Sequence, residues 1–186
     1  GHSRLIDIVL RQAWKEMALP VSITLLAVGG YGRGYLFPNS DIDLVVLLPA
    51  KGNKQEAMDA VTKSKLESWV HLLWDMGLEV GHSVRTLTEC TEEAKEITVQ
   101  TSLLEARRLA GSSKLFRIFS QVITSGLDPR EFFNAKQFEQ QQRHGRYHEV
   151  TYNLEPNLKE SPGGLRDLQN ILWVSHATGH GRSWPD

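Results

Sequence analysis

The chain has little cysteine, no long apolar run and no excess of basic residues, and each absence excludes a class of site or of binding partner. Cys90 is the only cysteine among 186 residues, which excludes an internal disulfide and a cluster of thiolate metal ligands. No apolar run approaches the roughly 18 residues of a membrane span. The formal net charge is −1, whereas proteins that follow a nucleic-acid backbone usually carry a basic excess. We therefore expect a cytoplasmic protein that binds neither membrane nor nucleic acid.

Two common nucleotide-binding motifs are also missing. Gly30 and Gly32 could begin the dinucleotide-binding pattern GxGxxG, but Tyr35 stands where the third glycine should be. The phosphate-binding pattern GxxxxGK[ST] does not occur, and there is no His-Asp dipeptide. The sequence therefore gives no support to a Rossmann domain or a P-loop.

The apolar pattern predicts an α+β fold in which a small sheet-containing domain is followed by helices. Helical spacing, buried-strand runs and capping signals define the elements. We expect helices over residues 4–18, 54–76 and 112–126, a further helix from Asp128, a last helix after 161–164, and strands over 22–28, 41–48 and 78–87. From about residue 88 the pattern becomes helical, and we interpret 105–109 as a charged helical turn. The domains are expected over 4–115 and 116–186, the second of them truncated.

The most informative stretch is "GGYGRGYLFPNSDIDLVVLL", residues 29–48, in which a glycine pair, a loop and two aspartates precede an apolar strand. Residues two apart on a strand share a face, so Asp41 and Asp43 should project side by side. Two close carboxylates repel each other, and a bound cation removes that repulsion. Either motif alone is common and is explained by a turn or a capped strand. Together, in this order, they favour a functional site.

This arrangement suits a metal-bound phosphate. Mg²⁺ takes oxygen ligands and often lies between protein carboxylates and substrate phosphates. Gly29 and Gly30 have no side chain, so their N–H groups can approach an anion closely. Arg33 could hold phosphate oxygens, and Ser40 could donate a hydroxyl beside the metal. We therefore expect Asp41 and Asp43 to bind Mg²⁺ or Mn²⁺, and the other four residues to bind a nucleotide.

The glycine pair followed by DxD resembles the DNA polymerase β-like nucleotidyltransferase superfamily. Four blocks, "GGYGRGYLFPNSDIDL", "GLEVGHSVRT", "TSLLEARRLAG" and "NLEPNLKESPGGLRDLQNILW", are similar more closely to the bacterial bifunctional PII uridylyltransferase/uridylyl-removing enzymes. The resemblance implies a mixed sheet and transfer of UMP from UTP to a tyrosine of the signalling protein PII, with release of pyrophosphate. It also implies a role in nitrogen regulation, with glutamine as an effector acting through regions absent from this chain.

The sequence departs from this pattern in two places. The superfamily usually has a third carboxylate on the next strand, where this chain has Ser83. Glu79 shares that face four residues earlier and is our candidate for a third metal ligand; Asp75 and Glu155 are the alternatives. The uridylyl-removing activity of such enzymes resides in an HD-type domain, which this sequence lacks, so we do not expect that activity here.

Other functions remain open at this point. The chain could transfer AMP to another protein or to a small molecule, or could tail RNA, although the near-neutral charge argues against RNA. It could also be an inactive module that binds a nucleotide or PII. The segment "SPGGLRDLQ" could be an ordinary turn into a helix, or could direct N–H groups and Arg166 toward phosphate.

Overall fold

The computed structural model describes residues 2–35, 40–49, 58–149 and 157–181. Their contacts divide the chain into two compact units, Gly1–Ser125 and Gly126–Asp186. The predicted boundary at residue 115/116 lies just inside helix α7 (Ser113–Ser125), which belongs to the first unit. Compactness does not show where a domain ends, so the predicted domain limits stay a prediction.

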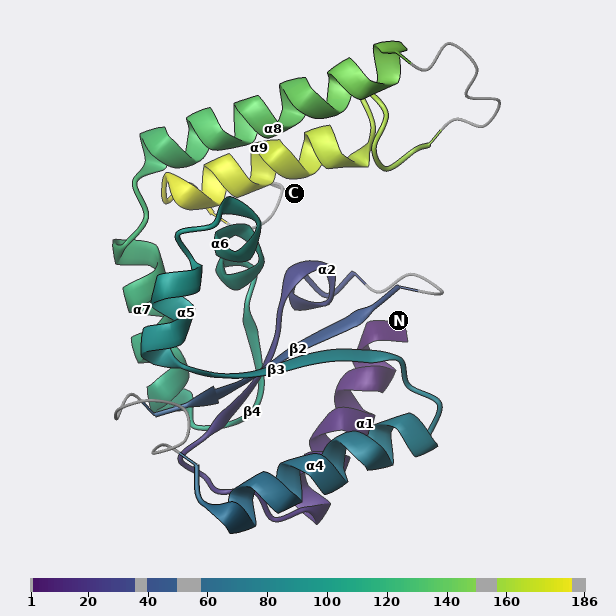
Figure 1. Ribbon diagram of the computed structural model, residues 1–186, viewed down its shortest axis with the longest axis vertical. Helices are drawn as coiled ribbons and strands as arrows, with labels where there is room; N and C mark the ends of the chain where they lie inside the picture. Colours follow the sequence, from purple (N-terminus) through teal and green to yellow (C-terminus); the bar gives the residue numbers. More distant parts are fainter. Residues whose placement is uncertain (1, 36–39, 50–57, 150–156, 182–186) are drawn as a thin grey trace. The chain divides into compact units, whose positions relative to one another are not determined.

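The first unit is built on a four-stranded mixed sheet (Figure 1). Its strands lie in the order β3-β2-β1-β4, and β1 is antiparallel to both β2 and β4 while β2 and β3 are parallel. The strands are β1 (Thr24–Ala27), β2 (Ile42–Leu48), β3 (Val80–Thr86) and β4 (Arg107–Gly111). Together with the surrounding helices they confirm the predicted α+β fold with a mixed sheet.

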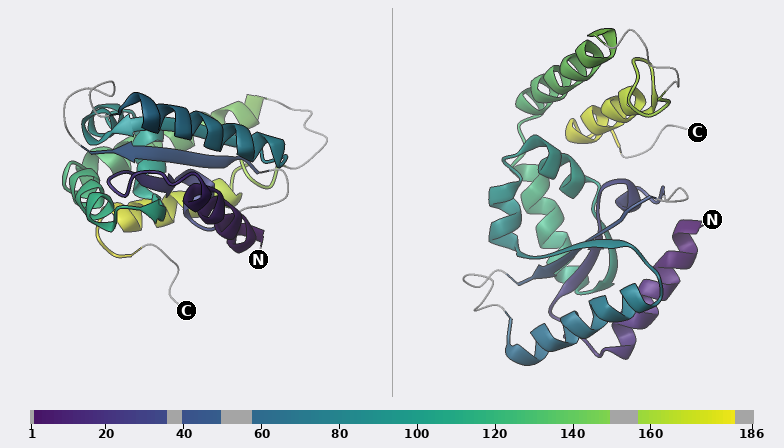
Figure 2. Two further views of the ribbon diagram at one scale, coloured as in Figure 1. Left: turned by 90° about the horizontal axis from the view of Figure 1, so that it is seen from below. Right: turned by 45° about the vertical axis from the view of Figure 1, so that its right-hand side comes forward.

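Helices cover both faces of this sheet (Figure 2). One face packs against α1 (His2–Glu16) and α4 (Ala60–Asp75), and Trp14 meets Trp69 there with ring centres 5.3 Å apart. The other side carries α5 (Leu87–Glu93), α6 (Ile97–Leu104) and α7. Val45 and Leu47, on the opposite face of β2 from Leu44, are also buried. The second strand is therefore covered on both faces, as its continuous apolar run predicts.

Capping explains where several helices begin. Asp59 caps α4 by accepting a hydrogen bond from the Thr62 N–H at 2.6 Å. The helix therefore begins at Ala60, whereas the sequence analysis predicts a start at residue 54. Residues 54–57 lie outside the described part of the chain. Gly77 ends the same helix with a φ of +74°, as predicted. Thr86 and Glu89 form a reciprocal capping box that turns the end of β3 directly into α5.

Strand β4 corrects the helical interpretation of residues 105–109. It pairs with β1 at the edge of the sheet, with an irregularity opposite Leu25 and Leu26. Gly111 adopts a φ of +82°, and a Cβ there would lie 2.1 Å from the Ile23 carbonyl oxygen. The prediction of a helical turn over "EARRL" is therefore wrong for residues 107–109. Only Leu109 of β4 is buried, so the sequence shows too little alternation of apolar and polar residues to indicate a strand.

The second unit contains α8 (Pro129–Glu149) and α9 (Leu165–Ala177), which lie side by side (Figures 1 and 2). Asp128 caps α8 by accepting hydrogen bonds from the N–H groups of Arg130 and Glu131 at 2.8 and 3.0 Å, as predicted. Trp173 of α9 is buried, with the Lys136 ammonium 4.6 Å from its ring centre. Among the described helices of both units, none combines the length and the apolarity that crossing a membrane requires.

Candidate active site

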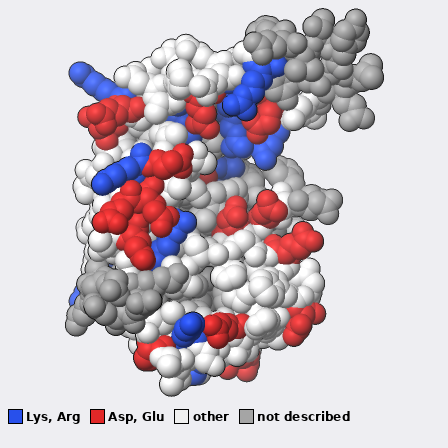
Figure 3. All heavy atoms as spheres, viewed as in Figure 1, with Lys and Arg blue, Asp and Glu red and all other residues white. Residues whose placement is uncertain are grey.

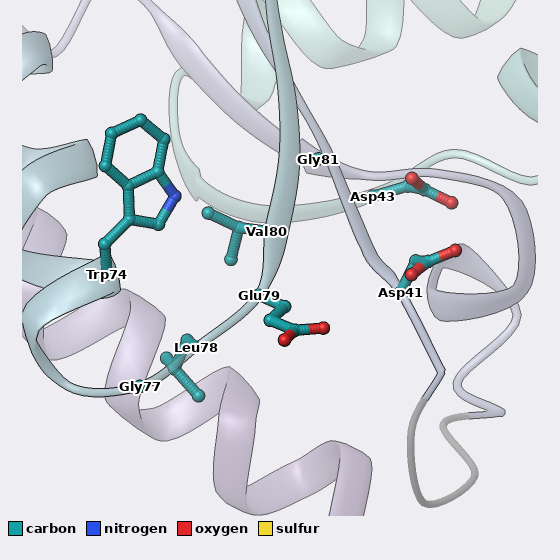
Figure 4. Close-up of a pocket in the computed structure, with 8 residues that line it drawn as sticks. All are labelled: Asp41, Asp43, Trp74, Gly77, Leu78, Glu79, Val80 and Gly81. Carbon is teal, nitrogen blue, oxygen red and sulfur yellow. The ribbon is translucent and has the colours of Figure 1, made fainter.

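The paired carboxylates lie at the beginning of β2, as the sequence predicts. Asp41 immediately precedes the strand and Asp43 is its second residue, while Ile42 between them is buried in the core. Figure 4 shows the two carboxylates close together. Burial raises the pKa of Asp43, and the charge of Asp41 raises it further. Both causes disfavour the ionised pair, so the site suits a cation that would stabilise it.

Gly29 brings the glycine pair against Asp43. The Val28 N–H donates a 3.0 Å hydrogen bond to the Asp43 carbonyl oxygen, which continues the antiparallel pairing of β1 with β2. Gly29 then has a φ of +56°, and a Cβ on it would lie 3.5 Å from Asp43 Oδ2 and 3.6 Å from Ser102 Oγ. The positive φ would strain most other residues at this position, whereas a Cβ would only make van der Waals contact with the carboxylate.

The glycine pair also forms the first turn of a short helix, α2 (Gly29–Gly32). Its first internal hydrogen bond is donated by the Gly32 N–H to the Val28 oxygen at 3.0 Å. The first N–H groups of a helix have no partner within the helix and point out of its end. Gly29 and Gly30 therefore lie at the end of α2 where the free N–H groups point outward, and their contact with a nucleotide stays a prediction.

Arg33 lies beside the glycine pair but already has a protein partner. Its guanidinium pairs with the Glu105 carboxylate, and both side chains are largely buried. A Cβ on Gly30 would lie 3.6 Å from Arg33 Nη2, so the guanidinium is folded over this turn. Ser40 is exposed and directly precedes Asp41. The predicted roles of Arg33 and Ser40 with a nucleotide stay predictions.

A partly buried ion pair connects helix α2 to α1 and β4. Tyr31 donates a 2.7 Å hydrogen bond to Asp7, and Arg107 binds both oxygens of Asp7 at 2.6 and 3.0 Å. Arg107 also donates to the Gly32 carbonyl oxygen at 3.2 Å. These three side chains come from α1, α2 and β4, so they connect the glycine turn to distant parts of the unit. Sequence reasoning missed this network.

The part of the chain that the structure describes does not assemble a three-carboxylate metal site. Asp41 and Glu79 directly precede the first register pair of β2 and β3, and both line one pocket of about 720 Å³ (Figure 4). Among the described residues, however, no group of three or more acidic, histidine or cysteine side chains is arranged to hold a metal ion. Asp75 is the last residue of α4, and Glu155 lies outside the described residues. The role of Glu79 as a third ligand stays a prediction.

Two residues near the carboxylates were not singled out from the sequence. Ser102 of α6 lies against Gly29, and Gly81 of β3 is the register partner of Asp43. Ser102 belongs to the block "TSLLEARRLAG", which was quoted only for its resemblance. On the face of the first unit that Figure 3 shows, acidic side chains predominate over basic ones. A nucleotide triphosphate that binds near these acidic side chains would need a cation to offset the repulsion between the negative charges.

Comparison with known families places this geometry in context. A family model described as "Nucleotidyltransferase domain" matches residues 8–104, which include strands β1, β2 and β3, the glycine pair and both aspartates. The chain belongs to the nucleotidyltransferase domain family. A second model, described as "GlnD PII-uridylyltransferase", matches residues 131–186. The two matches cover parts of the two compact units.

Curated relatives extend this similarity over the whole chain. Bifunctional uridylyltransferase/uridylyl-removing enzymes are 64% identical in Nitrosospira multiformis over 100% of the chain, 56% in Bordetella avium over 97%, and 52% in Burkholderia orbicola (strain MC0-3) over 98%. The resemblance inferred from the four sequence blocks is thereby confirmed. The chain spans about a fifth of the length of these relatives, which is 20–21% of each.

Solved structures show a more distant likeness. "Crystal structure of the toxin-antitoxin with AMP-PNP" is 18% identical with a TM-score of 0.35, and covers 78% of this chain and 97% of the matched chain. A second, of the toxin-antitoxin MntA-HpeT mutant-D39ED41E, is 15% identical with a TM-score of 0.37 and covers 78% and 98%.

Proposed function

We propose that this nucleotidyltransferase domain transfers UMP from UTP to a tyrosine of PII and releases pyrophosphate. The observation that carries the proposal is the position of Gly29 against the Asp43 carboxylate, with Asp41 beside it. A turn that we propose to bind phosphate and two carboxylates that we propose to bind a metal ion thus lie side by side, where a triphosphate could bind. The choice of UTP and PII rests on the similarity to uridylyltransferases over the whole chain.

Asp41 and Asp43 are proposed to hold Mg²⁺ or Mn²⁺, and their carboxylate oxygens are the ligands that these ions prefer. When bound, such an ion offsets the charge of the triphosphate and stabilises the oxygens of an in-line displacement. The Gly29 and Gly30 N–H groups would bind phosphate oxygens and orient the nucleotide. Glutamine is proposed as an effector that acts outside this chain.

The reaction itself is a single displacement at phosphorus. The tyrosine oxygen forms a bond to the α-phosphorus, and the bond from that phosphorus to the bridging oxygen of the β-phosphate breaks. Pyrophosphate leaves with the bonding electron pair, and the phenolic proton passes to a nearby carboxylate or to water. Free tyrosine has a pKa near 10, so a proton acceptor beside the attacking oxygen would assist the reaction.

The test is to incubate the chain with purified PII, Mg²⁺ and each of the four NTPs, and to measure the intact mass of PII. We expect a gain of one UMP with UTP alone. The double variant Asp41→Asn/Asp43→Asn should lower the rate at least about 100-fold, the scale seen when groups that stabilise transition-state charge are removed. Glu67→Gln, which changes an exposed carboxylate on α4, serves as the control.

Each other result has a definite meaning. A mass gain with ATP would keep the site and replace the nucleotide. Full activity of the double variant would remove Asp41 and Asp43 from the mechanism. If PII gained no mass with any nucleotide, this chain would lack the proposed activity, and Mg²⁺-dependent UTP binding alone would support a binding module.

A further inference from the structure

The pocket beside the carboxylates continues around the beginning of β3 to an exposed tryptophan (Figure 4). Trp74, near the end of α4, is 51% exposed and lines the same pocket as Asp41 and Asp43. Its ring centre lies 5.4 Å from that of His71 and 6.2 Å from that of His82, both in edge-on contacts. Tryptophan is enriched at the centres of binding surfaces, where it contributes a large apolar area with few rotatable bonds.

Strand β3 presents an open edge next to this tryptophan. It is the first strand in the order β3-β2-β1-β4, so within the described part of the first unit only its inner side is paired. An unpaired strand edge offers N–H and C=O groups to which an extended peptide can add as a further strand. The side chains of such a peptide alternate between the two faces of the sheet.

Gly81 leaves the way from this edge to Asp43 clear. The two residues are partners in the parallel register, and a Cβ on Gly81 would lie only 3.0 Å from Asp43 Oδ1. Any other residue would therefore place a side chain against the carboxylate, on the side that faces the open edge. Because Gly81 has no side chain, an acceptor that binds at the edge of β3 could reach the Asp43 carboxylate.

We propose that the edge of β3 around Glu79–Gly81, together with Trp74, binds the acceptor as an extended segment of PII that carries the target tyrosine. This inference rests on the proposed function and names how its protein substrate binds. In an added strand, the tyrosine would cross Gly81 toward Asp43, while its neighbours in the segment would lie on the opposite face, against Trp74 and His82.

The order of the strands supports this assignment. The glycine pair follows β1, on one side of β2, whereas the open edge belongs to β3, on its other side. In an in-line displacement the attacking and leaving oxygens lie on opposite sides of the phosphorus. A nucleotide held by the turn after β1 would direct its leaving group away from β3, so the attacking tyrosine would arrive from the β3 side.

The experiment compares Trp74→Ala with wild type and with Val61→Ala, which removes an exposed apolar side chain from the same helix. Initial rates are measured against PII concentration, and the Kd for Mg²⁺-UTP is measured separately. We expect Trp74→Ala to raise the KM for PII at least about 10-fold, the scale of a hot-spot truncation, with kcat and the UTP Kd changed less than about twofold. Val61→Ala should match wild type.

Two results would overturn the inference while leaving the proposed function intact: an unchanged KM for PII, or a weaker UTP Kd, which would make Trp74 a base-stacking residue. If wild type transfers nothing, the proposed function fails first, and amide hydrogen exchange with and without PII then decides the docking site. Slower exchange in residues 79–84 that Trp74→Ala abolishes supports the inference, and unchanged exchange refutes it.

Discussion

Replacing Arg107 with methionine should destabilise the packing of helix α2 against α1 and β4, and the hydrogen bonds of Arg107 indicate the size of the loss. Methionine keeps the apolar stem but removes the two hydrogen bonds to Asp7 and those to the carbonyl oxygens of Gly32 and Tyr31. Asp7 would retain its hydrogen bond from Tyr31 at 2.7 Å. The substitution therefore leaves a buried carboxylate with one donor in place of three.

The expected loss in the free energy of unfolding is about 2–3 kcal/mol. Hydrogen bonds to charged groups contribute roughly 1.5–3 kcal/mol, and breaking a fully buried ion pair costs about 3–5 kcal/mol. The side chain of Asp7 is 12% exposed, but that of Arg107 is 31% exposed, so water partly screens the pair. We therefore take a value below that for a fully buried pair.

This loss should depend on pH. Burial acts to raise the pKa of Asp7, but the hydrogen bonds from Arg107 and Tyr31 and the charge of Arg107 bring it below its ordinary value of 3.8. A carboxyl group with a lowered pKa in the folded state stabilises the protein above its unfolded pKa, and this contribution is lost as the pH falls through the folded pKa. The difference between wild type and Arg107→Met should be complete at neutral pH and should shrink below about pH 4.

Urea unfolding followed by the fluorescence of the buried tryptophans measures this effect at neutral pH and near pH 3. A double-mutant cycle of Arg107→Met with Asp7→Asn isolates the pair, and Arg108→Met on the same strand is the control. An equal loss in Arg108→Met, or a loss in Arg107→Met that is the same at both pH values, would refute the assignment of the stabilisation to the ionised pair.

Two further predictions concern other parts of the chain. Burial acts to raise the pKa of Asp167, but hydrogen bonds from the Gly163 N–H and from α8 side chains, Arg143 among them, lower it. Asp167→Asn should therefore destabilise the second unit by about 1–2 kcal/mol and speed amide hydrogen exchange in residues 161–167. Unchanged amide exchange in these residues would contradict this prediction. Burial raises the pKa of Cys90 to about 12, so a thiol reagent at about pH 8 should label it only after unfolding; rapid labelling of the native protein would show the thiol to be accessible.

The sequence was sufficient to predict the carboxylate pair, because local rules determine it. Alternation along an apolar strand places Asp41 and Asp43 on one face whatever the rest of the chain does. The cap at Asp128 likewise depends on residues within one turn. These features need no knowledge of distant partners, which is why the predicted strands and most helix ends agree with the structure.

Features that depend on distant partners could not be predicted in the same way. Residues 107–111 become a strand because β1 offers an edge about 80 residues earlier in the chain, a tertiary effect that outweighs local preference. The pairing of Asp7 with Arg107 joins residues 100 positions apart. The sequence left open whether Arg166 binds phosphate. In the structure its guanidinium donates hydrogen bonds to Gln169 and Glu160 within the second unit, and these partners could not be predicted from the sequence.

The sheet order assigns different physical demands to the two sides of β2. On the β1 side, Asp7, Tyr31 and Arg107 fix the glycine turn through buried hydrogen bonds, and such fixed donors can stabilise charge without reorganising during the reaction. On the β3 side, no described strand pairs with the outer edge and Gly81 has no side chain, as the proposed protein acceptor would require. A nucleotide is small and can be enclosed by rigid backbone, whereas a protein acceptor has to arrive, react and leave with its fold intact. A rigid side for the nucleotide and an open side for the acceptor are therefore what the proposed uridylyl transfer to PII would require of this domain.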